Sequence, residues 1–343
     1  MPISSYIAID AMGGDEGLTV MLAGVALARQ RFDSLRFLLV GDEAVIAPAL
    51  KSYPALAQCT EIVHAPDMIT ASEKPSQALR RAKTTSMGMA IDMVKLGRAG
   101  VAVSSGNTGA LMAIAKIALR TLPGIDRPAL AALMPTLGKN DVVMLDLGAN
   151  TECDARNLVQ FAVMGAAYAR TTLDLAAPRV ALLNIGTEAL KGTDSIRDAA
   201  AMLKAATHLP MVFSGFVEGN QLSHGNVDVI VCDGFTGNIA LKTAEGTAKF
   251  VGDLLKRAFR SSIRSKFGFL ISRPATKLLR DHLDPNNHNG GVFLGLNGLV
   301  VKSHGGANAI GVAHAIEVAA KMLRDDLTRR ISDDLSNFEA QAA

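Results

Sequence analysis

The sequence predicts an α/β fold, a three-layer α/β/α sandwich around a mainly parallel sheet. Short apolar runs recur along the chain, each ends in a cluster of Gly, Asp or Asn, and stretches with helical spacing of apolar residues lie between most of them. This alternation is typical of parallel strands covered by helices on both faces. The expected strands are 6–9, 36–40, 61–63, 101–104, 129–134, 142–147, 180–184, 211–213, 227–232 and 298–302. The clearest expected helices are 18–31, 77–96, 155–171, 194–206, 238–260 and 307–324.

The 343 residues contain no long Pro/Ser/Gly linker. We therefore expect a single α/β/α domain over residues 1–331, built either as one unit or as two subdomains that share one sheet. The end of the chain, residues 332–343, contains acidic and small residues and is expected to fray.

Composition excludes several classes of protein. Hydrophobic residues make up 49% and charged residues 20%, which is ordinary for a globular chain and excludes disordered or collagen-like architectures. Aromatic residues make up only 4%, Trp is absent and the net charge is +3, which argues against a nucleic-acid partner. Cys59, Cys153 and Cys232 stand apart with no CxxC pair, which argues against disulfides and fits a reducing cytoplasm.

The sequence shows no targeting segment and no grouped metal ligands. No signal-peptide pattern opens it, and its most apolar stretch, 158–169, is too short to span a bilayer. We expect a cytoplasmic protein that contacts a membrane only peripherally. Carboxylates are scattered and not clustered with His at ligand spacing, so no metal site is expected.

Five glycine-containing turns follow expected strands, at 10–17, 104–109, 146–150, 184–194 and 232–238. Ligands of parallel sheets bind at the carboxyl ends of strands, and glycines there let backbone N–H groups approach an oxyanion. No Walker A motif occurs, no GxGxxG follows a strand, and GxSxG and HExxH are missing. The candidate phosphate-binding and substrate-binding residues are Asp10, Gly13, Gly14, Ser105, Gly106, Thr108, Gly109, Asn150, Thr187, Asp233, Gly234, Thr236 and Gly237.

Two of these turns repeat one pattern. VAVSSGNTGAL (101–111) and VIVCDGFTGNI (229–239) each contain an apolar strand, a Gly-x-Thr-Gly turn and a helix start. Two interpretations stay open: two βα units share ordinary turn chemistry, or both turns bind anions.

Two side chains in the strand-end turns carry acid/base or cationic chemistry. Lys191 is the one strong cation there, either a solvated loop lysine or a partner for phosphate. His304 follows a strand, precedes a helix and is flanked by glycines, so its imidazole is either structural or a donor near neutral pH.

Seven strings in this order closely resemble the phosphate acyltransferase family PlsX of bacterial phospholipid synthesis. They are IAIDAMGGD, SSGNTGALMA, MLDLGAN, NIGTEALKGTD, FVEGN, VCDGFTGNIALKT and GLNGLVVKSHGGAN, and the similarity runs from about residue 6 to 322. The resemblance implies transfer of a long-chain fatty acyl group from acyl carrier protein to inorganic phosphate, giving acyl phosphate for a membrane glycerol-3-phosphate acyltransferase. It also implies a homodimer, no cofactor, and a fold similar to phosphotransacetylases and isopropylmalate dehydrogenases.

The missing nucleophile motif agrees with this chemistry. Attack by phosphate on a thioester requires only positioned phosphate, a polarised carbonyl and a stabilised leaving thiolate. We expect phosphate among the 104–109, 187–191 and 233–238 turns, with Lys191 as its cation. His304 and Asn238 are expected to donate to the thioester, while Asn107 and Asn150 hold the geometry. The alternatives are a short-chain phosphotransacetylase that uses acyl-CoA, and a non-catalytic anion-binding scaffold that docks on membranes.

Positive charge is concentrated in residues 249–281. This segment has nine Lys/Arg against Asp253 and Asp281, a net +7, so the rest of the chain is −4. Apolar residues at helical spacing and the apolar run 267–271 predict an inserted, protruding basic amphipathic helical hairpin with an apolar tip. Its faces suit an anionic membrane, an acidic carrier protein or a dimer mate. The expected contact residues are Arg257, Arg260, Arg264, Lys266, Phe267, Phe269, Leu270, Ile271, Arg273 and Lys277.

Overall fold

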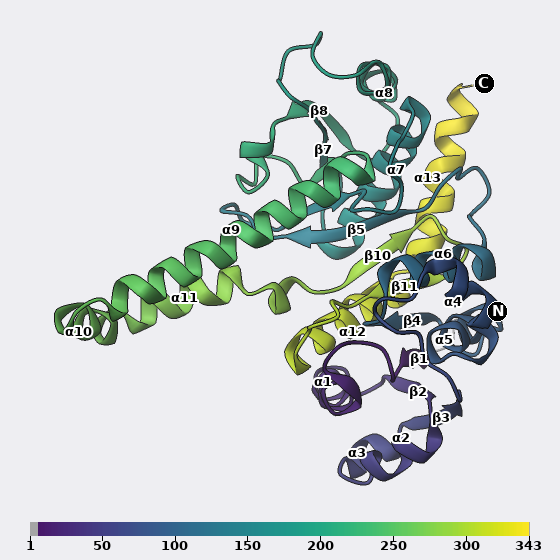
Figure 1. Cartoon of the computed structure of the whole chain (residues 1–343). Coiled ribbons are helices and arrows are strands. Elements are labelled where there is room, and N and C mark those ends of the chain that lie inside the picture. Colours follow the sequence, from purple (N-terminus) through teal and green to yellow (C-terminus); the bar gives the residue numbers. More distant parts are fainter. Residues whose placement is uncertain (1–5, 343) are drawn as a thin grey trace.

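One eleven-stranded sheet crosses the molecule in a computed structural model that describes residues 6–342 (Figure 1). The strand order is β3-β2-β1-β4-β11-β10-β5-β6-β9-β7-β8. The strands are β1 (Tyr6–Asp10), β2 (Arg36–Gly41), β3 (Thr60–His64), β4 (Val101–Ser104), β5 (Ala129–Met134), β6 (Val142–Leu145), β7 (Arg179–Leu183), β8 (Val212–Val217), β9 (Val229–Val231), β10 (Gly291–Leu294) and β11 (Leu299–Lys302).

The sheet consists of two parallel blocks joined by antiparallel pairs. Strands β3, β2, β1, β4 and β11 are parallel, and so are β6, β9, β7 and β8. Between the blocks, β10 pairs antiparallel with both β11 and β5, and β5 pairs antiparallel with β6. Strand β10 was not predicted from sequence, because β10 and β11 form a hairpin without the intervening helix that marks the other strands.

Helices cover both faces, which confirms the three-layer sandwich. Along β1, Ile7 and Ile9 face one hydrophobic core while Ala8 faces the other, as a period of two residues requires. The first core also contains side chains of α1 (Gly17–Arg31), α7 (Ala155–Thr172), α8 (Asp194–Ala205), α12 (Ala309–Arg324) and α13 (Leu327–Ala342). The second contains those of α4 (Pro75–Arg81), α5 (Ser86–Lys95), α6 (Thr108–Leu119) and the start of α9 (Gly234–Arg260).

The expected helix 77–96 is divided into two helices. A 3₁₀ turn, η1 (Ala82–Thr84), separates α4 from α5, and the Thr85 hydroxyl caps α5 by accepting from the Gly88 N–H at 3.3 Å. The break follows from this cap, because an N-cap residue leaves the helical conformation. The remaining short elements are α2 (Glu43–Leu50), α3 (Pro54–Ala57), η2 (Gly219–Gln221) and η3 (Pro285–His288).

The end of the described chain differs from the frayed segment expected from residue 332. Residues 327–342 form α13, and Leu327, Ile331 and Leu335 are buried in the first core. Asp334 forms an ion pair with Arg170 of α7. Because these apolar residues recur every four positions, one face of α13 packs on the domain although the composition is polar.

Helix α9 leaves the body and forms a projecting arm with α10 (Ile263–Ile271) and α11 (Arg273–Leu283) (Figure 1). We call residues 249–281 the basic arm. The expected apolar turn at 267–271 lies inside α10, which the Ser262 hydroxyl caps by accepting from the Ser265 N–H at 3.0 Å. Among residues 6–342, no helix combines the length and hydropathy needed to cross a membrane.

Candidate active site

The turns after β1, β4 and β11 meet at one place, which we call the Lys302 cluster (residues 10–15, 104–107 and 302–306). They meet because β1, β4 and β11 are neighbouring parallel strands. The Ser104 hydroxyl donates to Asp10 Oδ2 at 2.6 Å, and the Asp15 N–H donates to the Gly305 carbonyl at 2.9 Å. Burial raises the pKa of Asp10, although hydrogen bonds from Ser104 and Ser86 act in the opposite direction.

Glycines allow these turns to approach one another. A Cβ atom on Gly13 would lie 2.6 Å from Asp10 Oδ2 and 3.0 Å from the Gly106 nitrogen. Gly14 has φ +98°, a conformation that glycine adopts without steric cost, and lies beside Ser105. The candidate residues Asp10, Gly13, Gly14, Ser105 and Gly106 thus lie together in the Lys302 cluster.

Lys302, the last residue of β11, supplies the cation of this cluster. Its ammonium donates to the Ser105 carbonyl at 3.2 Å and to the Ser303 carbonyl. Burial lowers its pKa to about 8, while Asp10 and Asp15 act to raise it. An ammonium has three N–H donors, so one remains for a ligand. Lys302 was not among the candidates predicted from sequence, because it is the final residue of a strand and not part of the turn that follows.

The start of α6 borders the same cluster. Asn107 caps α6 by accepting from the Ala110 N–H at 3.0 Å, and its amide donates to the Ala71 and Glu73 carbonyls at 2.8 and 3.1 Å. Asn107 therefore holds the loop before α4 against α6. The first N–H groups of a helix have no intrahelical acceptor. Ser105 is 4% exposed, and its hydroxyl has no hydrogen-bond partner among the described residues.

His304 lies at the rim of the Lys302 cluster and is exposed. Its Nδ1 accepts from the Gly306 N–H at 3.3 Å, so the neutral ring carries its hydrogen on Nε2. Its backbone N–H donates to Asn289 Oδ1 at 2.9 Å, and Asn289 Nδ2 donates to the Ser303 hydroxyl at 2.8 Å. Asn289 thus fixes the His304 turn. The sequence analysis did not single it out, because this contact joins positions 15 residues apart.

A second cluster, the Asp146 cluster (residues 146–150 and 233–238), is arranged differently. The buried Asp146 carboxylate accepts from the N–H groups of Leu130, Ala149 and Asn150 at 3.0, 3.0 and 2.7 Å, and from Asn150 Nδ2 at 2.8 Å. Burial raises its pKa, and these hydrogen bonds oppose the rise. Asn150 Nδ2 also donates to the Pro128 carbonyl at 2.8 Å. These polar groups of Asp146 and Asn150 therefore hydrogen-bond to other parts of the protein and stabilise the turn.

Asp233 and the glycines of this cluster set the start of α9. The Asp233 carboxylate accepts from the Thr236 N–H and the Thr236 hydroxyl, both at 2.8 Å. Cβ atoms on Gly234 and Gly237 would lie 2.5 Å from the Asn150 carbonyl and 1.9 Å from the Asp146 carbonyl. Asn238 is exposed beside Gly148.

Helix α9 connects the two clusters. It begins at the Asp146 cluster, and farther along it the positive charge of Lys242 lowers the pKa of Lys302. Lys242 also forms an ion pair with Glu245 at 2.7 Å. Lys242 is therefore the residue of α9 whose charge reaches Lys302.

The 184–194 turn forms a separate unit. Lys191 and Thr187 are exposed, and the Lys191 carbonyl accepts from Asn184 Nδ2 at 3.1 Å. Within residues 6–342, no hydrogen bond or ion pair joins this turn to either cluster. The structure thus brings together the 10–17 and 104–109 turns, and the 187–191 turn expected beside the 104–109 turn forms no contact with it through hydrogen bonds or ion pairs of the described residues.

The two cysteines near the Asp146 cluster are not activated thiols. Burial, together with the nearby carboxylates of Asp146 and Asp233, raises the pKa of Cys153 to about 12. Burial also raises the pKa of Cys232. Since a thiolate is the reactive form, these residues are unsuited to nucleophilic catalysis near neutral pH.

Comparison with known proteins identifies the family. A family described as "Fatty acid synthesis protein" matches residues 5–330. A protein of Erythrobacter litoralis named phosphate acyltransferase is 65% identical over 332 residues, covering 97% of this chain and 94% of that protein. A Rhodospirillum centenum protein of the same name is 53% identical over 334 residues, with the same coverages.

A solved structure shares the fold. The crystal structure of a phosphotransacetylase from Streptococcus pyogenes aligns with a TM-score of 0.61 and 18% identity, over 95% of each chain. At this identity the likeness shows the fold alone. The family match and the high identity to curated relatives, both over nearly the whole chain, show that this chain belongs to the phosphate acyltransferase (PlsX) family.

Proposed function

We propose that this protein transfers a long-chain fatty acyl group from an acyl carrier protein thioester to inorganic phosphate. The product is an acyl phosphate for phospholipid synthesis. The family assignment supports acyl transfer to phosphate, and the sequence resemblance implies the carrier thioester as donor. The observation that carries the proposal is Lys302, whose ammonium lies against the carbonyl of Ser105 at the start of α6.

Phosphate binds at the start of α6 in this proposal. The free N–H groups of the helix, the buried Ser105 hydroxyl and the third N–H of Lys302 supply donors for an oxyanion. Lys302 replaces Lys191 as the phosphate cation.

With phosphate bound at the start of α6, the acyl transfer proceeds in one displacement at the thioester carbonyl. A phosphate oxygen attacks the thioester carbonyl carbon, a C–O bond forms, and the C–S bond breaks as the thiolate leaves with its electron pair. The thiolate takes a proton from the Lys302 ammonium, whose pKa of about 8 is close to that of a thiol, and solvent restores that proton. His304 donates through Nε2–H to the carbonyl oxygen as negative charge develops there.

The deciding experiment incubates the pure protein with palmitoyl acyl carrier protein and labelled phosphate and measures labelled acyl phosphate. We expect formation of acyl phosphate and release of free carrier thiol. Absence of acyl phosphate at saturating donor would refute the proposal. Turnover with acetyl-CoA alone would favour a short-chain phosphotransacetylase, and phosphate binding without any turnover would favour a non-catalytic scaffold.

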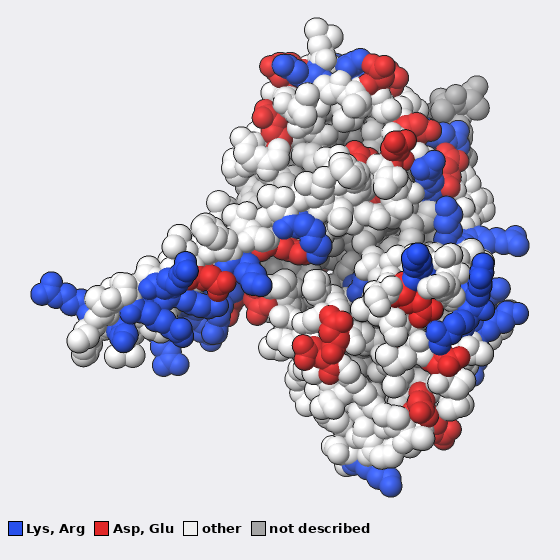
Figure 2. Space-filling view, in the orientation of Figure 1, with Lys and Arg blue, Asp and Glu red and all other residues white. Residues whose placement is uncertain are grey.

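We also propose that the basic arm holds the enzyme on an anionic membrane surface, where a poorly soluble product passes to a membrane glycerol-3-phosphate acyltransferase. Phe250, Phe267 and Ile271 are 67, 65 and 81% exposed. Lysines and arginines gather along the arm (Figure 2). Of these, Arg257, Arg264 and Lys277 form no ion pair within the described residues. Basic and apolar contacts together are what stable peripheral binding requires.

Liposome sedimentation tests this second proposal. The variant Phe267→Ser/Phe269→Ser/Leu270→Ser should lose binding to anionic vesicles and keep turnover of soluble substrate. Since the Phe269 ring packs on Phe259 at 5.2 Å, Arg257→Glu/Arg264→Glu/Lys277→Glu provides a second variant that spares the apolar contacts. Leu137→Ser/Ile185→Ser/Leu190→Ser is the control, because these apolar residues lie outside the arm and are even more exposed. Unchanged sedimentation, or dissociation of a homodimer into monomers, would contradict membrane attachment.

A further inference from the structure

A second basic surface lies away from the basic arm, over α4 and α6. Residues 74–83 and 108–120 contain no Asp or Glu. Their basic residues are Lys74, Arg80, Arg81, Lys83, Lys116 and Arg120. Figure 2 shows Lys and Arg gathered over α4, α5 and α6, on the side of the molecule opposite the arm. We call residues 74–83 and 108–120 the α4–α6 face.

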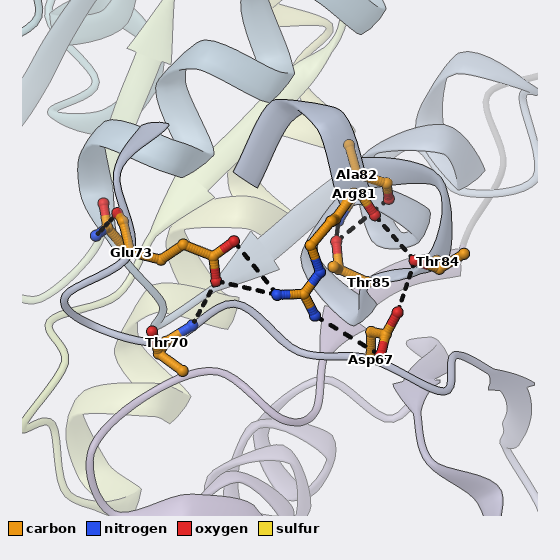
Figure 3. Close-up of polar contacts among 9 residues, drawn as sticks. Asp67, Thr70, Glu73, Arg81, Ala82, Thr84 and Thr85 are labelled. Carbon is orange, nitrogen blue, oxygen red and sulfur yellow. Dashed lines mark hydrogen bonds and ion pairs between the residues drawn. The ribbon is translucent and has the colours of Figure 1, made fainter. Parts of the chain in front are cut away.

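The carboxylates beside this face are already neutralised. Arg81 forms ion pairs with Asp67 at 3.6 Å and Glu73 at 3.4 Å, and the Thr84 hydroxyl donates to Asp67 at 2.8 Å (Figure 3). Arg81 thus spans the loop before α4 and the turn after it. Both segments are fixed by these contacts.

The other cations of the face are left for a partner. Lys74, Arg80 and Lys83 are exposed and form no ion pair with any described residue. Glu73, Gln77, Arg80 and Arg81 line an open hollow of about 360 Å³. Arg80 is therefore the cation without an ion pair that borders this hollow.

The face adjoins the candidate active site. Helix α4 packs on α6, and Asn107 at the start of α6 donates to the Glu73 carbonyl, one residue before Lys74. A Cβ atom on Gly109 would lie 3.1 Å from Pro75 Cγ. A protein bound to α4 would therefore lie beside the turn that holds Ser105 and the Lys302 ammonium.

We infer that the α4–α6 face docks the acidic surface of the carrier protein that brings the acyl thioester. This inference rests on the proposed function, in which a carrier thioester is the donor. Inorganic phosphate needs one convergent site, whereas these charges are spread along two helices. A donor must deliver its thioester to the Lys302 cluster, and this face borders that cluster while the basic arm projects away from the body. Opposite charges on two surfaces raise the association rate and fix orientation.

The test compares kinetics with two donors. The variant Lys74→Glu/Arg80→Glu/Lys83→Glu should lower kcat/KM for the acyl carrier thioester at least about tenfold at low salt, mainly through KM, because rim charges act on association. Turnover of the uncharged thioester of N-acetylcysteamine should stay within about twofold of the original protein. The dependence of log kcat/KM on log salt should flatten. Anisotropy of a labelled carrier measures the same loss of binding directly.

Two further variants define the outcome. Lys74→Arg/Arg80→Lys/Lys83→Arg should keep carrier affinity, since the charges remain. Arg257→Glu/Arg264→Glu/Lys277→Glu removes equal charge from the basic arm and should leave carrier KM unchanged. The inference is overturned if the α4 variant keeps the original KM and anisotropy, if it loses both donors equally, or if the arm variant shows the effect instead. If the original protein makes no acyl phosphate from the carrier thioester, the proposed function itself fails.

Discussion

The Lys302 and Asp146 clusters begin from nearly the same string and differ in what their polar groups do. GNTG at 106–109 and GFTG at 234–237 each begin a helix after a strand. In the Asp146 cluster, four donors converge on one carboxylate. In the Lys302 cluster, a hydroxyl is buried without a partner and an ammonium is held between carbonyls. A Gly-x-Thr-Gly turn therefore specifies the start of a helix. Whether the turn can bind an anion depends on which hydrogen-bond donors have no partner within the protein.

Of the changes that test this difference between the clusters, removing the ammonium of Lys302 is expected to have the largest effect. Lys302→Met should lower kcat by about 1,000-fold, near the upper range for one positioned donor or acid. Circular dichroism should show a folded protein. Lys302→Arg keeps the charge but not the geometry and should recover only part of the activity. Activity within about threefold of the original in Lys302→Met would place the chemistry elsewhere.

The matching change in the Asp146 cluster should damage stability and not chemistry. Gly237→Ala places a methyl group 1.9 Å from the Asp146 carbonyl, so α9 must shift. We expect a loss of about 3 kcal/mol in the free energy of unfolding, measured by urea denaturation. Gly246→Ala, which adds a methyl group to the same helix with nothing within 4 Å, is the control. Equal stability of the two variants would mean that the close approach is not needed.

A change at His304, on the rim of the Lys302 cluster, should have a smaller effect than a change at Lys302 itself. His304→Ala should lower kcat about 100-fold with an unchanged melting temperature, the usual size of one donor to an oxyanion. His304→Gln retains an N–H donor and should recover part of the loss. Full activity of the alanine variant would make the histidine structural.

The lowered pKa of Lys302 predicts a pH dependence of kcat. As pH rises through about 8, the ammonium loses its proton, so kcat should fall, by about tenfold per pH unit above that value. In unfolding, the lysine regains its ordinary pKa of 10.5. The unfolded chain then binds more protons between these values, so the stability of the original protein should rise with pH relative to Lys302→Met in this window. A flat kcat profile from pH 7 to 10 would exclude this role.

The smallest effect is expected at the separate 184–194 turn. Lys191→Ala should change the phosphate KM by less than about twofold, because this exposed side chain lies in a turn that no hydrogen bond joins to either cluster. A phosphate titration under saturating donor measures it. A tenfold increase would restore the assignment made from sequence and would require the turn to close over the Lys302 cluster.

The amino-acid sequence by itself determined the secondary structure and the local distribution of charge. Alternating apolar runs and turn residues predicted nearly all strands, because strand burial depends on local periodicity. The strings at residues 10–17 and 104–109 predicted glycine-containing turns at strand ends, and the sheet order shows that these two turns are neighbours. The excess of positive charge in residues 249–281 was visible by counting.

Only the tertiary structure decided which polar side chains form the candidate active site. The β10 hairpin divides the sheet into two parallel blocks, so turns with similar strings belong to separate clusters. Burial lowers the pKa of Lys302 to about 8, against the opposing charge of Asp10, and its ammonium contacts the Ser105 carbonyl, a group far away in the chain. Desolvation and the sharing of hydrogen-bond donors are non-local quantities. A sequence shows which donors exist, and only the packed chain shows which of them remain free.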